Sequence, residues 1–244
     1  MNNPECAREA VRQISYRVTN VSLAVIVAIS QVILLGLNKS ITAQIIPDNT
    51  LGTESSVVTP DNINGLESDR ISGGAARGSN LFHSFREFNI DEGRGAYFDN
   101  PAAIQNIFSR VTGNNPSNIM GTLGVLGNAN LFFMNPNGII FGNNARLDIR
   151  GSFLATTADS ILFPDGNKFS ALNPEAAPLL TVNVQQPVGL ELEGREGIIT
   201  SKGILEVDEG QNLALVGGDV ILDGGELNAS GGRVELGGLA ETGN

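Results

Sequence analysis

Short apolar segments recur along the second half of the chain, each bounded by glycine, asparagine or aspartate. They occupy residues 182–184, 190–192, 204–207, 213–216, 220–222 and 234–236. Alternating apolar residues between turn-forming residues are typical of short β-strands joined by tight corners. The pattern therefore predicts an all-β structure made of many short strands.

One of these segments returns after a fixed interval. The sequence LALVGG at 213–218 is followed by VELGGL at 234–239, 21 positions later. A period near 20 residues, built from strands and glycine-rich corners, indicates a stacked coil, the β-helix or β-solenoid. An antiparallel sandwich or barrel is the alternative, because Asp223-Gly224 is a hairpin signal.

The aromatic residues divide the chain beyond residue 43 into two regions. All of them lie between Phe82 and Phe169, and only small and aliphatic apolar residues follow. A single rung buries too few side chains to offset the entropy of ordering it, so folding must spread from one stable, capped end. We therefore expect a capped N-terminal region at 44–170. Regular β-helix rungs should follow at 171–244 and break off before a closing cap.

The first 43 residues have the segment order of a secretory signal peptide. A polar start with three arginines precedes the apolar run VSLAVIVAISQVILLGL at 21–37, and small residues precede a cut expected after Ala43. The alternative is a membrane anchor. However, a span needs about 20 predominantly apolar residues, and this run is shorter and interrupted by polar side chains. We therefore predict a helical signal peptide at 1–43.

The net charge limits the classes of partner, and the cysteine content bears on export. The 244-residue chain has a formal net charge of −11, and the expected leader removes more basic than acidic residues. An acidic surface repels phosphate backbones, so nucleic acid is not expected as a partner. The only cysteine, Cys6, lies in the leader. The rest of the chain is therefore free of disulfides that would prevent it from crossing an outer membrane unfolded.

Residues 130–142, NLFFMNPNGIIFG, predict two short strands separated by a tight turn. The run Asn135-Pro136-Asn137-Gly138 suits a type I turn, with Asn first, Pro second and Gly fourth. The buried positions expected on either side are Leu131, Phe133, Ile139 and Phe141. On turn chemistry alone, this run predicts a stable turn and no functional role.

Several stretches together resemble the filamentous haemagglutinin N-terminal domain, which is the secretion domain of two-partner secretion exoproteins. The matching stretches are NLFHSFREFNI at 80–90, NIFSRVTG at 106–113, NPSNIMGTL at 115–123, NLFFMNPNGIIFG at 130–142 and GSFLATTADSILF at 151–163. The run from Asn135 to Ile139 is the most specific, since the family is known for an Asn-Pro-Asn-Gly-Ile element. A second Asn-Pro-Asn element of some members has no clear match, and Asn115-Pro116-Ser117 is only similar.

The resemblance implies a right-handed parallel β-helix with an N-terminal cap. It also implies export by the general export machinery, passage through the periplasm, and recognition by an outer-membrane β-barrel transporter with POTRA domains. The product would be a large secreted or cell-surface adhesin or haemagglutinin with a host or surface target. The element for transporter recognition or folding nucleation would be Asn135, Pro136, Asn137, Gly138 and Ile139. A purely structural role for these five residues fits the sequence equally well.

Residues that could support catalysis or metal binding are few. His83 is the only histidine and lies between Phe82 and Phe85, so we expect a packed structural side chain and neither a zinc site nor a cofactor. Acidic clusters occur at 191–196 and 206–209. A β-helix carbohydrate-active enzyme, either a polysaccharide lyase or a hydrolase, is therefore the alternative function. Solvent-facing strand residues give the same acidic pattern, and we predict that the chain is not an enzyme.

Residues 104–111 fit either a helix or a strand. The apolar residues from Ile104 to Val111 have helical spacing, and Asn100-Pro101 would suit a helix start. The family resemblance instead implies a strand at 106–111, which we adopt.

Overall fold

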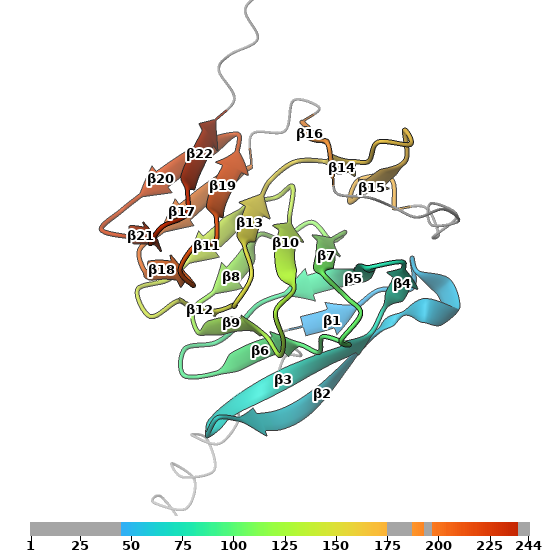
Figure 1. Ribbon diagram of the computed structural model, residues 1–244, viewed down its shortest axis with the longest axis horizontal. Helices are drawn as coiled ribbons and strands as arrows, with labels where there is room; N and C mark the ends of the chain where they lie inside the picture. Colours follow the sequence, from blue (N-terminus) through green and yellow to red (C-terminus); the bar gives the residue numbers. More distant parts are fainter. Residues whose placement is uncertain (1–44, 175–186, 193–196, 239–244) are drawn as a thin grey trace, which may run out of the picture. The chain divides into compact units, whose positions relative to one another are not determined.

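The computed structural model describes residues 45–174, 187–192 and 197–238, which form a β-solenoid of about six turns (Figure 1). The expected fold class, an all-β parallel β-helix with an N-terminal cap, is confirmed. The expected leader at 1–43 and the apolar segment at 182–184 lie outside the described residues. Within the described ranges, no helix is long and apolar enough to cross a membrane.

Three parallel faces make up the coil (Figure 1). The first face contains β5 (Asn80–Phe88), β7 (Asn106–Val111), β10 (Asn130–Met134), β13 (Phe153–Thr156), β19 (Leu213–Gly217) and β22 (Val234–Gly238). The second contains β8 (Ser117–Ile119), β11 (Ile139–Phe141), β17 (Ile198–Ser201) and β20 (Asp219–Leu222). The third contains β3 (Leu66–Gly73), β6 (Gly95–Phe98), β9 (Thr122–Val125) and β12 (Arg146–Asp148), followed by β18 (Ile204–Val207) and β21 (Glu226–Ala229).

Each of rungs 2 to 5 takes one strand from each face. Rung 1 contains β5 and β6, and rung 2 contains β7, β8 and β9. Rung 3 contains β10, β11 and β12, and rung 4 contains β13, β17 and β18. Rung 5 contains β19, β20 and β21, and β22 begins rung 6. The chain therefore advances one rung per circuit of the three faces.

Residues of neighbouring rungs stack in register. Leu213 pairs with Val234, which confirms the 21-residue repeat expected at this point. The strands on either side of Asp223-Gly224, β20 and β21, lie on different faces and pair in parallel with strands of rung 4. Asp223-Gly224 is therefore a corner of the coil and not a hairpin turn. The antiparallel sandwich alternative is wrong.

The strand expected at 106–111 is confirmed as β7, and every one of its side chains is buried. One side of the strand packs inside the coil, where Ile107 belongs to the inner core. The other side is also covered, since Phe108 belongs to a second cluster. A strand buried on both sides loses the usual alternation of apolar and polar residues. This explains why its sequence also fits helical spacing.

Hydrogen-bonded asparagines line the corner where the strands of the first face begin. Asn106 donates through Nδ2 to Oδ1 of Asn80 at 2.9 Å, and Asn130 donates in the same way to Asn106 at 2.9 Å. Asn130 in turn accepts from the backbone N–H of Ser152 at 2.8 Å. A side-chain amide both donates and accepts, so one residue type can bridge successive rungs.

A second apolar cluster lies on the first face, outside the inner core. The rings of Phe82, Phe108 and Phe132 stack on neighbouring strands, with centroid separations of 5.1 and 4.6 Å. Phe163 and Phe169 pack edge-on against this stack. They come from a three-stranded extra-helical sheet beside the coil (Figure 1). Its strands are β14 (Ser160–Leu162), β15 (Lys168–Ser170) and β16 (Gly189–Glu191).

The expectation that residues 190–192 form part of a regular rung is wrong. Strand β16 pairs antiparallel with β14, and Leu190 packs against the second cluster. The chain leaves the coil after β13 and returns at β17, so Phe153 pairs with Leu213, 60 positions later. An alternating pattern identifies a strand but does not identify the strand with which it pairs.

Antiparallel strands cover the N-terminal end of the coil. They are β1 (Ile45–Pro47), which pairs with β5, β2 (Ser56–Ile63), which pairs with β3, and β4 (Ala75–Arg77), which also pairs with β5. A short 3-10 helix, η1 (Gly52–Glu54), lies between β1 and β2. The β2–β3 hairpin turns at Asn64-Gly65, where both residues have positive φ. Together these elements form the cap that the open sheet edges require.

Candidate functional site: the Asn135–Ile139 corner

The Asn135–Ile139 segment forms a corner between the first and second faces of rung 3. It joins β10 to β11, and the backbone N–H of Gly138 donates to the carbonyl of Asn135 at 3.1 Å. This bond closes the four-residue turn predicted from the sequence. Gly138 has a φ of +117°, a value that side-chain-bearing residues rarely adopt. The buried positions expected beside the turn are confirmed, since Leu131, Phe133, Ile139 and Phe141 are fully buried.

Asn135 holds the corner together from inside. Its side chain is fully buried, and Nδ2 donates to the backbone carbonyl of Asn115 at 3.0 Å and to Oγ of Ser117 at 2.9 Å. Its Oδ1 accepts from the backbone N–H of Asn137 at 3.0 Å. A buried amide with these partners satisfied stabilises one corner geometry, whereas an unpaired amide would be costly.

Asn137 connects the corner to the preceding rung along a second path. Its Nδ2 donates to the backbone carbonyl of Gly113 at 2.7 Å and to Oδ1 of Asn135 at 3.2 Å. Asn137 is half-buried, whereas Asn135, Pro136, Gly138 and Ile139 are buried. The five residues predicted from the sequence therefore form one corner, and four of them are inaccessible to a partner in the folded coil.

The Asn115-Pro116-Ser117 element lies directly beneath this corner. Ser117 pairs with Ile139 across the second face, and both Asn115 and Ser117 accept from Asn135. The two similar elements thus occupy equivalent corners of rungs 2 and 3. Their similarity is visible in the sequence, whereas their contact is visible only in the structure.

Rung 4 covers the corner from the other side. A Cβ placed on Gly197 would collide with the carbonyl oxygen of Pro136 and with the side chain of Thr157. The hydroxyl of Thr157 donates to the carbonyl of Gly197 at 2.9 Å and accepts from the N–H of Gly218 at 3.1 Å. The corner is therefore closed only when the chain has returned from the extra-helical sheet.

His83 is a packed structural side chain, as expected. It is fully buried between the rings of Phe85 and Phe98, and its Nδ1 lies 3.0 Å from Oγ of Ser56 on β2. Burial lowers the pKa of His83 to about 3, so its imidazole is neutral in the folded chain. Among the described residues, no group of His, Cys, Asp and Glu side chains is arranged to hold a metal ion.

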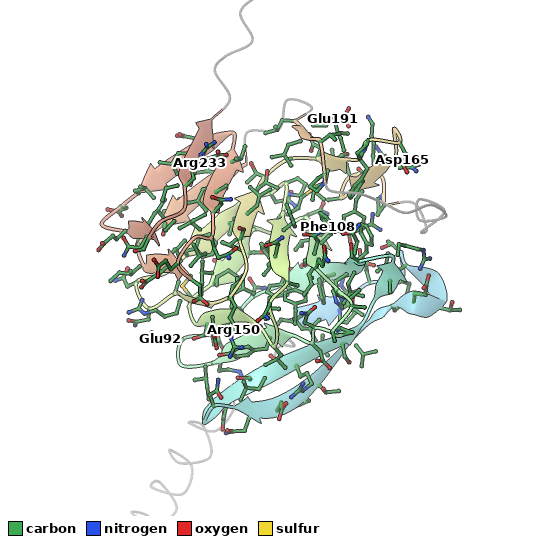
Figure 2. All side chains as sticks on the ribbon, in the orientation of Figure 1. Glu92, Phe108, Arg150, Asp165, Glu191 and Arg233 are labelled. Carbon is green, nitrogen blue, oxygen red and sulfur yellow. The ribbon has the colours of Figure 1, made fainter. Side chains whose placement is uncertain are left out.

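The acidic cluster at 206–209 does not converge with basic groups, and residues 193–196 of the other expected cluster lie outside the described residues. Asp148, Glu206, Asp208 and Glu209 line an open groove of about 450 Å³ on the third face. Glu191 instead belongs to the extra-helical sheet (Figure 2) and forms an ion pair with Lys168 at 2.6 Å. The residues lining the groove include no lysine, arginine or histidine that could assist proton transfer. The carbohydrate-enzyme alternative therefore receives no support.

The fold and the Asn135–Ile139 corner define the chain as a capped parallel β-solenoid domain. Its family is shown by a match over residues 43–244 to the model of the TPS (two-partner secretion) secretion domain. The chain belongs to this family, and the resemblance drawn from its motifs is confirmed. It is the secretion domain of a two-partner secretion exoprotein, a class of protein that is exported and either secreted or held at the surface.

Two known proteins illustrate the similarity. The heme/hemopexin-binding protein of Haemophilus influenzae is 27% identical over 158 residues, which cover 62% of this chain. The match spans only 15% of the length of that protein. Among solved structures, the filamentous hemagglutinin secretion domain matches with 15% identity and a TM-score of 0.41. That alignment covers 80% of this chain and 99% of that one.

Proposed function

We propose that the chain directs the export of a larger surface protein and then starts its folding outside the cell. The leader at 1–43 takes the chain to the general export machinery and is cut after Ala43. An outer-membrane β-barrel transporter with POTRA domains then binds the unfolded chain in the periplasm. Family membership supports this route, and the confinement of cysteine to Cys6 is compatible with passage of an unfolded chain.

The burial of the Asn135–Ile139 corner is the observation that carries the proposal. Asn135 and Pro136 are buried beneath rung 4, so a partner can contact them only before the coil closes. The transporter therefore binds this segment in its extended form, as sheet-edge recognition of an unfolded strand would require. Closure of the corner outside the cell then removes the segment from the transporter.

Folding on the outer side supplies the direction of transport. Each rung that forms buries apolar side chains and adds backbone ladders to the rung before it, and this opposes backsliding. Strand pairing between residues 60 positions apart, as for Phe153 and Leu213, is slow and helps to keep the chain unfolded in the periplasm. No nucleotide hydrolysis is needed at the outer membrane.

We further propose that the domain has no catalytic role and that the exoprotein acts by binding, as an adhesin or haemagglutinin with a host or surface target. The acidic groove has no basic partner among its lining residues, and the charged side chain of Glu191 is neutralised by Lys168. The related heme/hemopexin-binding protein is also named for a binding activity.

The test is secretion of the full chain with and without a matched outer-membrane transporter. Protein is measured in the medium and in the periplasm for the wild type and for an Asn135→Ala/Asn137→Ala variant. We expect release that depends on the transporter and is lost in the variant. Asn144→Ala is the matched control, because Asn144 is an exposed corner asparagine whose side chain donates to Glu92, which is also exposed. Its release should equal that of the wild type.

A third variant separates recognition from stability. Thr157→Val weakens the cover over the corner without changing the Asn135–Ile139 segment. Loss of release in the double alanine variant, with release retained in Thr157→Val, supports recognition of the segment by the transporter. Equal loss in both indicates that the corner acts in folding alone. Release that is independent of the transporter would overturn the proposed route.

A further inference from the structure

Arg110 is a fully buried cation on β7 whose guanidinium contacts three separate parts of the structure. Its Nε donates to Oγ of Ser84 on β5 at 2.9 Å. Its Nη2 donates to Oγ1 of Thr50, in the loop that follows β1, at 2.8 Å. Its Nη1 donates to the backbone carbonyl of Ser170 on β15 at 2.6 Å. The guanidinium also lies over the ring of Phe169, with Cζ 4.4 Å from the centroid.

Asp48 provides the opposite charge through bridging hydroxyl groups. Its carboxylate accepts from Oγ1 of Thr50 at 2.6 Å, from Oγ of Ser84 at 2.8 Å and from Oγ1 of Thr112 at 2.6 Å. The hydroxyls of Thr50 and Ser84 therefore each contact both Asp48 and Arg110. We call this set, together with the Ser170 carbonyl, the Arg110 network.

The pKa values agree with a network that keeps both charges. Burial alone would raise the pKa of Asp48, but the hydrogen bonds from Thr112, Thr50 and Ser84 outweigh it and leave the pKa below its usual value. Burial lowers the pKa of Arg110 to about 10, while the charge of Asp48 opposes this change. Both groups are therefore charged at neutral pH.

The buried guanidinium couples the stability of the elements that provide its hydrogen-bond partners. Removing any one partner leaves the guanidinium desolvated and incompletely hydrogen-bonded, which is costly in a protein interior. Thr50 belongs to the cap, Ser84 to rung 1 and Ser170 to the extra-helical sheet. None of these elements can detach alone without exposing Arg110 to that cost.

We propose that the Arg110 network joins the N-terminal cap, rungs 1 and 2 and the extra-helical sheet into one cooperative folding unit, with Arg110 as the positioning residue. The first and last members of the network in the sequence are Asp48 and Ser170, so the unit is incomplete until Ser170 is in place. One consequence rests on the proposed function: during export, the cap is not locked until Ser170 has emerged from the transporter.

Hydrogen exchange of the purified full-length chain tests the coupling. The amide of Thr50, which donates to Asp48, reports on the cap, and the amide of Ala171, which donates to the carbonyl of Asp159, reports on the extra-helical sheet. In the wild type, both should open with the same free energy. Arg110→Met should accelerate both by about 10- to 100-fold. The amide of Phe153 in rung 4 should be much less affected.

Two further variants serve as control and safeguard. Arg86→Met changes an exposed arginine on β5 and should leave both amides at wild-type rates. Should Arg110→Met fail to fold, Thr50→Val provides the second test, because it removes one hydroxyl from the cap and is read out at Ala171. Acceleration at Ala171 in Thr50→Val supports coupling through Arg110.

Two results would overturn the proposal. One is acceleration confined to the cap or to the extra-helical sheet in Arg110→Met. The other is an unchanged exchange rate at Ala171 in Thr50→Val. Since exchange is measured without a transporter, a failed secretion experiment leaves this result unaffected, and a failed exchange experiment leaves the secretion route unaffected.

Discussion

The ring of Tyr97 on β6 lies against the backbone of Gly124 on β9, its partner in the next rung. A Cβ on Gly124 would overlap the edge of that ring. The Tyr97 hydroxyl reaches one rung further and hydrogen-bonds to Asp148 on β12. Burial, together with this carboxylate, raises the pKa of Tyr97 to about 12. Glycine is therefore required at position 124 by the space that the Tyr97 ring occupies, and not by the backbone angles of the residue itself.

Replacing Gly124 by alanine should destabilise the coil by about 1–3 kcal/mol, because the Tyr97 ring must shift to admit the added methyl group. Urea unfolding monitored by circular dichroism measures the loss. The matched control is the same substitution in a Tyr97→Leu background. There the clash with the ring is relieved and only the close approach to the backbone carbonyl of Asp148 remains, so alanine should cost clearly less than in the wild-type background. Equal destabilisation in both backgrounds would show that the ring is not the cause.

The stability of the domain should fall as the pH is lowered from 7 to 5, because of His83. Its pKa is about 3 in the folded chain and about 6.5 when unfolded, so below pH 6.5 the unfolded chain binds a proton that the folded chain excludes. The free energy of unfolding should drop by about 2 kcal/mol over this interval. Asp48, whose pKa is lowered, loses its contribution only below about pH 4.

The pH dependence is measured as the urea midpoint at pH 7 and pH 5. In His83→Gln the titrating group is gone, while an amide oxygen remains for the hydroxyl of Ser56. Most of the difference in urea midpoint between pH 7 and pH 5 should therefore disappear, whatever the stability of the variant at pH 7. If the urea midpoint of this variant still fell between pH 7 and pH 5 as it does in the wild type, a group other than His83 would be responsible.

Asn135→Ala should destabilise the coil more than Asn137→Ala. The first change removes hydrogen bonds from a fully buried amide to Asn115 and Ser117 and should cost about 2–3 kcal/mol. The second removes a half-buried donor to Gly113 and should cost about 1 kcal/mol. Asn144→Ala should stay within about 0.5 kcal/mol of the wild type. A reversed order in denaturant unfolding would contradict the assignment of Asn135 as the inner residue of the corner.

Thr157→Val should loosen rungs 4 and 5 while leaving the earlier rungs folded. The substitution removes the hydroxyl that bonds to Gly197 and Gly218, at a cost of about 2 kcal/mol. A solenoid responds locally, because each rung contacts only its neighbours. Amide exchange should therefore accelerate at Gly218 but not at Leu131. Thr200→Val, on a partly exposed position of β17, is the control and should leave Gly218 unchanged.

Local signals in the sequence were sufficient for the strands, the corner and the repeat. The turn at Asn135–Gly138 follows from residues adjacent in the chain, and the 21-residue interval follows from a corner of nearly constant length. The sequence contains a further local signal. NLF at 80, NIF at 106 and NLF at 130 each place an asparagine before an aliphatic residue and a phenylalanine. In the structure, the three asparagines are hydrogen-bonded from rung to rung, and the rings of Phe82, Phe108 and Phe132 stack on neighbouring strands.

Short-range periodicity and turn chemistry act within a few residues, so they predict the fold class and the five residues of the corner. They do not predict that Leu190 leaves the coil, that rung 4 buries Pro136, or that Arg110 connects the cap to Ser170. These contacts join residues dozens of positions apart. Their partners are selected by how whole rungs pack, and no local pattern records that choice.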